Sequence, residues 1–146
     1  AAFIKCQLAS SNPLPKKGNL FVSVKNSDKP KIVPIVRSFQ KLGFKIKATH
    51  GTASYLMDQG INVSKINKVS QGSPHIVEDL LDENIDILIN TTEGRKSIND
   101  SFSVRRTALM KSLPYFLTIS GARAAINSIK ELRNNDLEVN QITSFH

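Results

Sequence analysis

The stretch FKIKATHGTASYLMDQG, residues 44–60, predicts a strand, a tight turn and a helix in direct succession. Apolar and basic residues alternate over Phe44–Thr49, which is typical of a strand with one partly covered face. A short helix is expected from Thr52 to Gln59, and Gly60 ends it. Strands and helices alternate in this way along most of the chain, so the sequence predicts an α/β fold built on a parallel sheet.

The other elements follow from apolar runs and helical spacing. Further strands are predicted at Leu20–Val24, Lys65–Val69, Ile85–Asn90 and Tyr115–Ile119. Further helices are predicted from Ser27–Pro30 to Gly43, over His75–Asn84, Ser101–Leu113 and Gly121–Asn134, with a closing extended segment over Val139–Phe145. Pro34 fits the first of these helices only within its first turn, where backbone N–H groups have no intrahelical partner.

The composition indicates one globular domain. At 146 residues, 40% of them hydrophobic, the chain is long enough to bury a core, and no run approaches the length of a membrane span. The single cysteine, Cys6, excludes an intramolecular disulfide and favours a cytoplasmic protein. Residues 10–18 are rich in Ser, Pro and Lys, and the chain does not begin with methionine. We therefore expect a fragment of a longer protein, with 1–18 as a connecting segment and 19–146 as the domain.

The net charge of +8 is concentrated in the first third of the chain. Residues 1–47 hold ten Lys and Arg and one acid, Asp28, whereas residues 48–146 hold ten Lys and Arg and eleven acids. A basic segment can indicate nucleic-acid binding. This one lacks the interleaved aromatic residues that stack on bases, so a solvated or partner-facing surface with one or two phosphate contacts is favoured and no nucleic-acid partner is expected.

Polar residues gather where the predicted strands end, and parallel strands present their carboxyl ends at one edge, the ligand crevice of open α/β sheets. The residues concerned are Ser23 and Lys29, then Thr49 and Thr52, then Lys68, then Asn90 and Thr92. The turn from Thr49 to Thr52 combines hydroxyls, a glycine and the start of a helix, which suits a phosphate group. A plain turn with Thr52 as the helix N-cap remains an alternative.

Asn90 and Thr92 suit hydrogen bonds to a ribose or a base edge. Asp100 either accepts from a ribose diol or caps the following helix, and the sequence alone favours the cap. Catalytic signals are weak. His50 and His75 have no Ser or Cys at a triad spacing, and the three histidines have no metal-ligand spacing. The sequence therefore predicts a binding module with no catalytic residues and no metal site.

Five strings carry a resemblance to a known family: LFVSV at 20–24, ATHGTA at 48–53, NKVSQGSPHI at 67–76, ILINTTEG at 87–94 and SVRRTAL at 103–109. Together they resemble the carboxy-terminal allosteric domain of the carbamoyl phosphate synthase large subunit, which has the methylglyoxal synthase-like fold. The resemblance implies a three-layer α/β/α architecture with a five-stranded parallel sheet. It also implies an effector phosphate on Lys29, Thr49, Thr52 and Lys68, with its ribose and base near Ser23, Ile76, Asn90, Thr92 and Asp100.

The resemblance further implies a parent enzyme, a glutamine-hydrolysing, ATP-dependent ligase of pyrimidine and arginine biosynthesis. In that family a glutaminase small subunit is the partner, ATP and Mg²⁺ serve the catalytic domains, and this domain itself holds no cofactor. Uridine nucleotides such as UMP or UTP inhibit, and IMP activates in many bacteria. Methylglyoxal synthase is the enzymatic alternative, but its catalytic Asp and His are replaced here by Ser73-Pro74 and Asn99-Asp100. A single Thr118 replaces the threonine pair of some members, which argues against ornithine activation.

Overall fold

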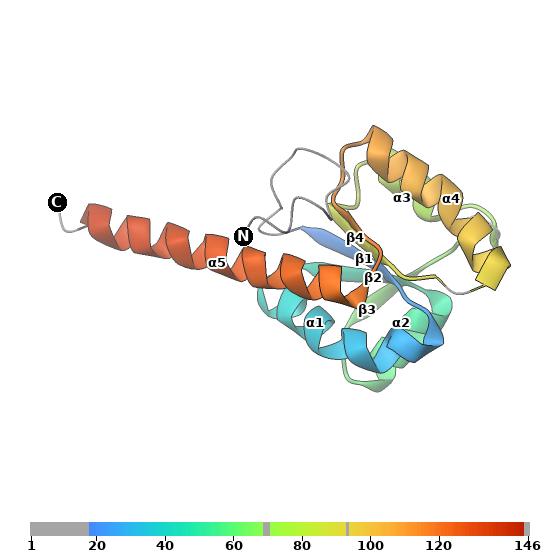
Figure 1. The fold of residues 1–146 in the computed structure, drawn as a ribbon, viewed down its shortest axis with the longest axis horizontal. Coiled ribbons are helices and arrows are strands. Elements are labelled where there is room, and N and C mark those ends of the chain that lie inside the picture. The colour runs from blue at the N-terminus through green and yellow to red at the C-terminus, as the bar shows by residue number, and fades with distance from the viewer. Residues whose placement is uncertain (1–17, 69–70, 93, 145–146) are drawn as a thin grey trace.

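The fold is a parallel sheet between two layers of helices (Figure 1). The structure is a computed structural model that describes residues 18–68, 71–92 and 94–144. Within these ranges, side chains are described up to residue 92 and over 101–134. The strands are β1 (Asn19–Ser23), β2 (Lys45–Thr49), β3 (Val63–Ile66), β4 (Ile87–Asn90) and β5 (Tyr115–Phe116). The helices are α1 (Lys29–Lys41), α2 (His50–Asp58), α3 (Ile76–Leu81), α4 (Gly94–Met110) and α5 (Ile119–Ser144), with a short 3-10 turn, η2, at Asn26–Asp28. The predicted α/β/α architecture is confirmed, while most of the predicted 1–18 connecting segment lies outside the described residues.

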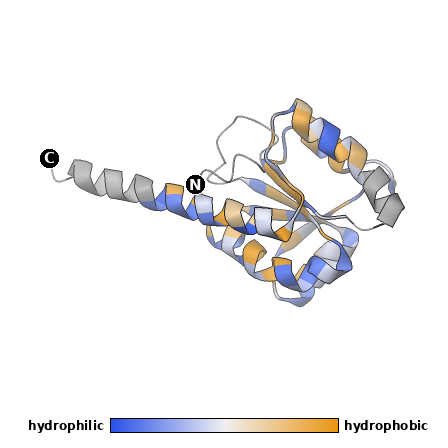
Figure 2. Ribbon diagram, viewed as in Figure 1, coloured by the Kyte–Doolittle hydropathy of each residue, from blue (hydrophilic) through white to orange (hydrophobic). Residues whose placement is uncertain are grey.

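The two faces of the sheet are covered by different helices because side chains alternate along each strand. Leu20 and Val22 of β1 pack with α1, α2 and α5, whereas Phe21 between them packs with α3 and α4. All three are buried, and burying an aliphatic or aromatic side chain of this size stabilises a fold by about 1.5–3 kcal/mol. Figure 2 shows the hydrophobic residues along the strands and on the helix surfaces that face them.

The strand order places a topological switch point between β1 and β4. The sheet has the order β3-β2-β1-β4-β5, and all its strand pairs are parallel. From β1 the chain moves outward to β2 and β3 on one side, then returns to add β4 and β5 on the other. Ser23 and Asn90 are register partners at the ends of β1 and β4. Ligands in open α/β sheets bind at such a switch point, beyond the carboxyl ends of the strands.

Three local predictions are wrong. Pro34 lies inside α1 rather than in its first turn. Because Pro34 and Pro30 are both exposed, water can satisfy the Pro30 carbonyl that the missing N–H leaves without a partner. Residues 139–144 continue α5 as a helix instead of forming an extended segment. Asp100 cannot cap the helix after β4, because α4 already begins at Gly94.

The ends of several elements also differ from the prediction. Strand β3 ends at Ile66 and β5 at Phe116, earlier than expected, and α2 begins at His50, before the expected Thr52. Within the described residues, no helix combines the length and the apolar character needed to cross a bilayer.

Candidate functional site

The start of α2 forms the centre of the candidate site. Thr49 is the N-cap residue, with an extended backbone (φ −64°, ψ 159°), so the alternative that placed Thr52 at the N-cap is wrong. The Thr49 side chain makes no capping bond and instead donates to Ser23 Oγ at 3.0 Å. The backbone N–H groups of the first helical turn therefore have neither an intrahelical partner nor a side-chain cap from Thr49. Such N–H groups, together with the helix dipole, favour an anion.

Lys29 brings a positive charge to the same place. It is the first residue of α1, and its Nζ donates to Asn26 Oδ1 at 2.8 Å. A Cβ atom built on Gly51 would lie 3.3 Å from this Nζ, so the ammonium group lies against the first turn of α2. No carboxylate among the described side chains lies within 4.0 Å of it. An ammonium group and a helix N-terminus thus meet without a neutralising partner, which is an arrangement suited to a phosphate.

Two buried threonine hydroxyls fix the loop that follows β1. Thr52 Oγ1 accepts from the Val24 backbone N–H at 3.2 Å and lies 3.5 Å from the Val24 carbonyl oxygen. Thr91 Oγ1 accepts from the Lys25 backbone N–H at 3.0 Å. Thr52 was predicted to bind phosphate, but here its hydroxyl is engaged with the backbone and positions the loop that precedes Lys29. Thr91 was not among the predicted site residues, although it adjoins the predicted Asn90 and Thr92.

Asn90 ends the central strand and is oriented by two hydroxyls. Its Nδ2 donates to the Tyr115 hydroxyl at 2.7 Å and to Ser101 Oγ at 3.0 Å. Both amide hydrogens are therefore used within the protein, which leaves Oδ1 as the group able to accept from a ribose or a base. Burial raises the pKa of Tyr115, while the Asn90 bond and the Arg105 charge act in the opposite direction. No local signal in the sequence indicates Tyr115 or Ser101, because their contacts with Asn90 depend on the tertiary fold.

The remaining predicted residues are Lys68, Thr92, Ile76 and Asp100. Lys68 follows the end of β3 and is half-buried, in a turn closed by the bond from Gln71 N to the Lys68 carbonyl at 3.0 Å. Thr92 is half-buried directly after β4. Ile76 is only 1% exposed and packs in the core between the sheet and α3–α4, so in this conformation it is a core residue rather than a wall open to ligand. The side chain of Asp100 lies outside the described residues.

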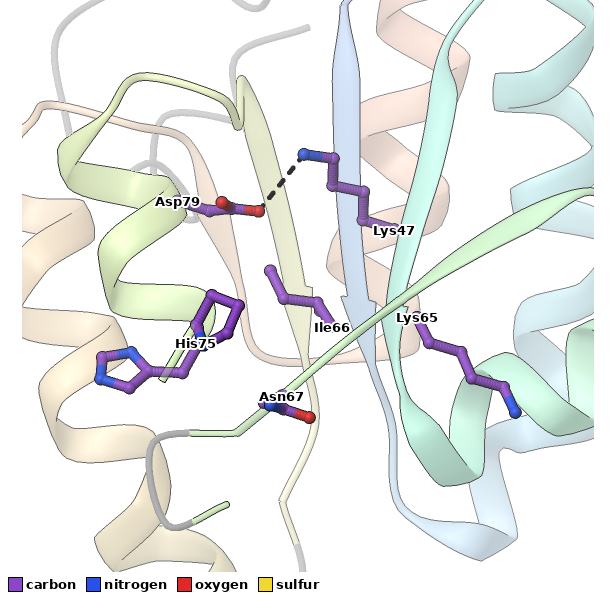
Figure 3. Close-up of a pocket in the computed structure, with 7 residues that line it drawn as sticks. Lys47, Lys65, Ile66, Asn67, His75 and Asp79 are labelled. Atoms are coloured by element: carbon purple, nitrogen blue, oxygen red, sulfur yellow. Dashed lines mark hydrogen bonds and ion pairs between the residues drawn. The ribbon is translucent and has the colours of Figure 1, made fainter. Parts of the chain in front are cut away.

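A cavity of about 220 Å³ lies between β2, β3 and α3 (Figure 3). Figure 3 shows Lys47 and Asp79 pointing toward one another, with 3.2 Å between Nζ and Oδ2, while Lys65 points away from them. The Nδ1 atom of His75, a further lining residue, is buried and has no hydrogen-bond partner within the described residues. The ion pair satisfies the charges of Lys47 and Asp79, so neither of these two groups is a free base there.

Ser73, His75 and Glu78 meet at the start of α3 without forming a catalytic triad. Ser73 Oγ donates to Glu78 Oε2 at 2.9 Å, and the His75 backbone N–H donates to Oε1 of the same carboxylate at 3.0 Å. The bond from Ser73, and then that from His75, lowers the pKa of Glu78. A serine that donates to a carboxylate has no histidine base to activate it. Among the described residues, no three His, Cys, Asp or Glu side chains form a group that could hold a metal ion.

Comparisons with known proteins concern the family and the fold of this chain. The family model described as "MGS-like domain" matches residues 31–117. The carbamoyl phosphate synthase large chain of Rhizobium meliloti is 44% identical over 99% of this chain, and that of Methanobrevibacter smithii is 47% identical over 97%. The carbamoyl phosphate synthase large chain, C-terminal section, of Methanopyrus kandleri is 43% identical over the whole chain. This chain spans 12%, 13% and 27% of these relatives, respectively.

A solved structure shows the same fold. The crystal structure of methylglyoxal synthase from Elizabethkingia anophelis aligns with 77% of this chain and 79% of its own, with a TM-score of 0.58 and 16% sequence identity. At that identity the likeness concerns the fold alone. The family match and the relatives among carbamoyl phosphate synthase large chains show that the chain belongs to the MGS-like domain family.

Proposed function

We propose that this chain is the regulatory domain of a carbamoyl phosphate synthase large chain and that it binds a nucleotide effector by its phosphate at the carboxyl ends of β1, β2 and β4. The observation that supports this most directly is the Lys29 ammonium group against the first turn of α2, with no described carboxylate to neutralise it. The ammonium group and the helix N-terminus each attract an anion. Because they lie together, they favour an anion that has more than one charged oxygen, such as a phosphate.

In the proposed complex, the phosphate accepts from Lys29 and from backbone N–H groups at the start of α2. The hydroxyls of Ser23 and Thr49, which lie 3.0 Å apart, then reorient toward it, and Lys68 adds a second ammonium group from the turn after β3. The ribose and base extend toward β4, where Asn90 Oδ1 accepts and the Thr92 hydroxyl accepts or donates, and Asp100 accepts from a ribose hydroxyl. Thr52 supports the site by holding the loop after β1.

The effector acts through a coupling free energy. A nucleotide such as UMP, UTP or IMP must bind the active and inactive conformations of the parent enzyme unequally, and such couplings are typically about 1–3 kcal/mol. We propose that the parent enzyme is a cytoplasmic, glutamine-hydrolysing, ATP-dependent ligase that serves pyrimidine and arginine biosynthesis. Its other large-subunit domains use ATP and Mg²⁺, its small subunit is the glutaminase, and the present domain performs no chemistry.

A thermal-shift screen tests the binding proposal. UMP, UTP, IMP and inorganic phosphate are added separately to the chain, and a ligand at a hundred times its dissociation constant stabilises by about 2.7 kcal/mol. For a chain of this length that corresponds to a rise in Tm of roughly 5–10 °C. Lys29→Met should abolish the rise, whereas Lys31→Met, which removes an exposed lysine from the same helix, should retain it. Equal shifts in both variants, or no shift with any nucleotide, would contradict the proposal.

Methylglyoxal synthase activity is the alternative suggested by the solved structure with the same fold. The segment that resembles the catalytic-aspartate region has Ser73-Pro74 in its place, and the Ser73 hydroxyl donates to Glu78. An assay for methylglyoxal formed from dihydroxyacetone phosphate is therefore expected to show no turnover. A nucleic-acid-binding module would instead show an affinity that falls steeply with salt and extends over several nucleotides.

A further inference from the structure

A larger cavity, of about 460 Å³, lies between the end of α1 and the middle of α5. Its lining residues are Ser38, Lys41 and Leu42 from the α1 side, and Lys130, Arg133 and Asn134 from α5. Each set has the spacing i, i+3, i+4, which places its members on one face of a helix. The volume is within the range of about 300–1,000 Å³ that small-molecule sites occupy.

The hydrogen bonds in this cavity go to neutral oxygens. Arg133 Nη1 donates to the Leu42 carbonyl at the end of α1 at 2.6 Å, and Lys130 Nζ donates to Ser38 Oγ at 3.3 Å. A similar bond joins Arg37 to the Gln59 carbonyl at the end of α2, also at 2.6 Å, and Arg37 does not line this cavity. The need to pair a carbonyl at a helix end therefore explains the position of one arginine. It does not explain why two lysines lie in the same cavity as Arg133.

The charge balance of the cavity is strongly positive. Lys41, Lys130 and Arg133 contribute three formal charges, and no carboxylate lines the cavity among the side chains that the structure describes. The carboxyl end of α1 offers only about half a negative charge through its dipole. No described acidic side chain lies within 4.0 Å of the three cations. Within the described residues no acidic side chain therefore pairs with these charges, and a bound anion would do so.

We propose that this cavity is a second anion site, separate from the strand-end site, and that it takes a small polyvalent oxyanion such as a diphosphate or a polycarboxylate. The Arg133 guanidinium keeps one N–H on Leu42 and presents its others to two oxygens of the ligand. Lys41 and Lys130 neutralise the remaining charge, and Asn134 and Ser38 supply hydrogen bonds. The site is distinct from the first because α1 carries Lys29 at one end and Lys41 at the other, about 18 Å apart along the helix.

The test is a titration of the chain with inorganic pyrophosphate, and in a second arm with citrate, followed by amide NMR and calorimetry. Saturable shifts are expected at the amides of Lys41, Leu42 and residues 130–134. Lys41→Gln and Lys130→Gln are expected to weaken binding at this site by roughly two- to fivefold each, as is typical of exposed charge pairs. Both lysines are exposed, so the variants should fold, and their thermal denaturation checks this.

Arg37→Gln is the matched control, because it removes an arginine that also donates to a helix-end carbonyl but does not line the cavity. It should leave the affinity at this site unchanged. Binding of pyrophosphate alone assigns a phosphorylated ligand, and binding of citrate alone assigns a carboxylate ligand. The proposal is overturned if neither anion shifts these amides, if the lysine variants bind as the wild type does, or if Arg37→Gln weakens binding as much as they do.

Discussion

Replacing Gly51 with alanine should stabilise the fold while weakening phosphate binding. Gly51 lies in the first turn of α2, where an alanine side chain restricts the unfolded chain and favours the helix. The expected gain is about 0.5–1 kcal/mol, or a rise in Tm of roughly 1–4 °C for a chain of this length. The new Cβ, however, would lie 3.3 Å from Lys29 Nζ, so the ammonium group must move by a few tenths of an ångström.

The same methyl group occupies the surface that the phosphate is proposed to approach. Loss or lengthening of one charge-assisted hydrogen bond would cost about 1–2 kcal/mol, which corresponds to a roughly five- to thirtyfold rise in Kd. Thermal denaturation without ligand measures the first effect, and calorimetric titration with a nucleoside monophosphate measures the second. Ser54→Ala, at an exposed position of the same helix, controls for the alanine content of α2. A Gly51→Ala variant that binds the nucleotide as the wild type does would refute the reasoning.

Three further predictions concern other parts of the site. Thr52→Val leaves the Val24 N–H without its partner, so thermal denaturation should show a loss of about 1–3 kcal/mol that Thr52→Ser largely restores; a neutral valine variant would contradict this. Burial raises the pKa of Tyr115 above its ordinary value of 10.0, so the contribution of the neutral Tyr115 hydroxyl to stability is fully present below that pH and is lost as the pH rises above it. Tyr115→Phe should flatten this fall in a pH series of thermal denaturation measurements. Charge reversal at the exposed Arg105 and Arg106 should abolish effector regulation of the parent enzyme while leaving effector affinity unchanged, and unaltered regulation would discard that role for α4.

Much of the architecture is predictable because the apolar runs are unambiguous. Ile87-Leu88-Ile89 predicts a central strand, and in the structure all three side chains are buried, two on one face of the sheet and one on the other. Two helices depart from what local preference predicts. Pro34 lies inside α1 at a place where both Pro34 and Pro30 are exposed to water, and α5 continues through Val139 and Ile142, which are β-branched residues typical of strands.

The candidate site is predictable in position but not in detail. The ends of parallel strands meet at one edge, which is why Ser23 and Thr49 were expected together and are joined by a hydrogen bond. Which hydroxyls remain available to a ligand depends on contacts between distant segments. Thr52 bonds to the backbone after β1, and Asn90 bonds to Tyr115, 25 residues further along the chain. No local pattern in the sequence encodes either pairing.

The most direct test of the proposed phosphate site is an amide NMR titration of the chain with inorganic phosphate, followed by UMP and IMP. The largest shifts for all three ligands are expected at the first-turn amides of α2, Gly51 and Thr52, and Lys29→Met is expected to remove them. The nucleotides should add shifts near Asn90 and Thr92. Shifts confined to other surfaces, or shifts at Gly51 that persist unchanged in Lys29→Met, would contradict the claim that this lysine and the start of α2 together bind a phosphate.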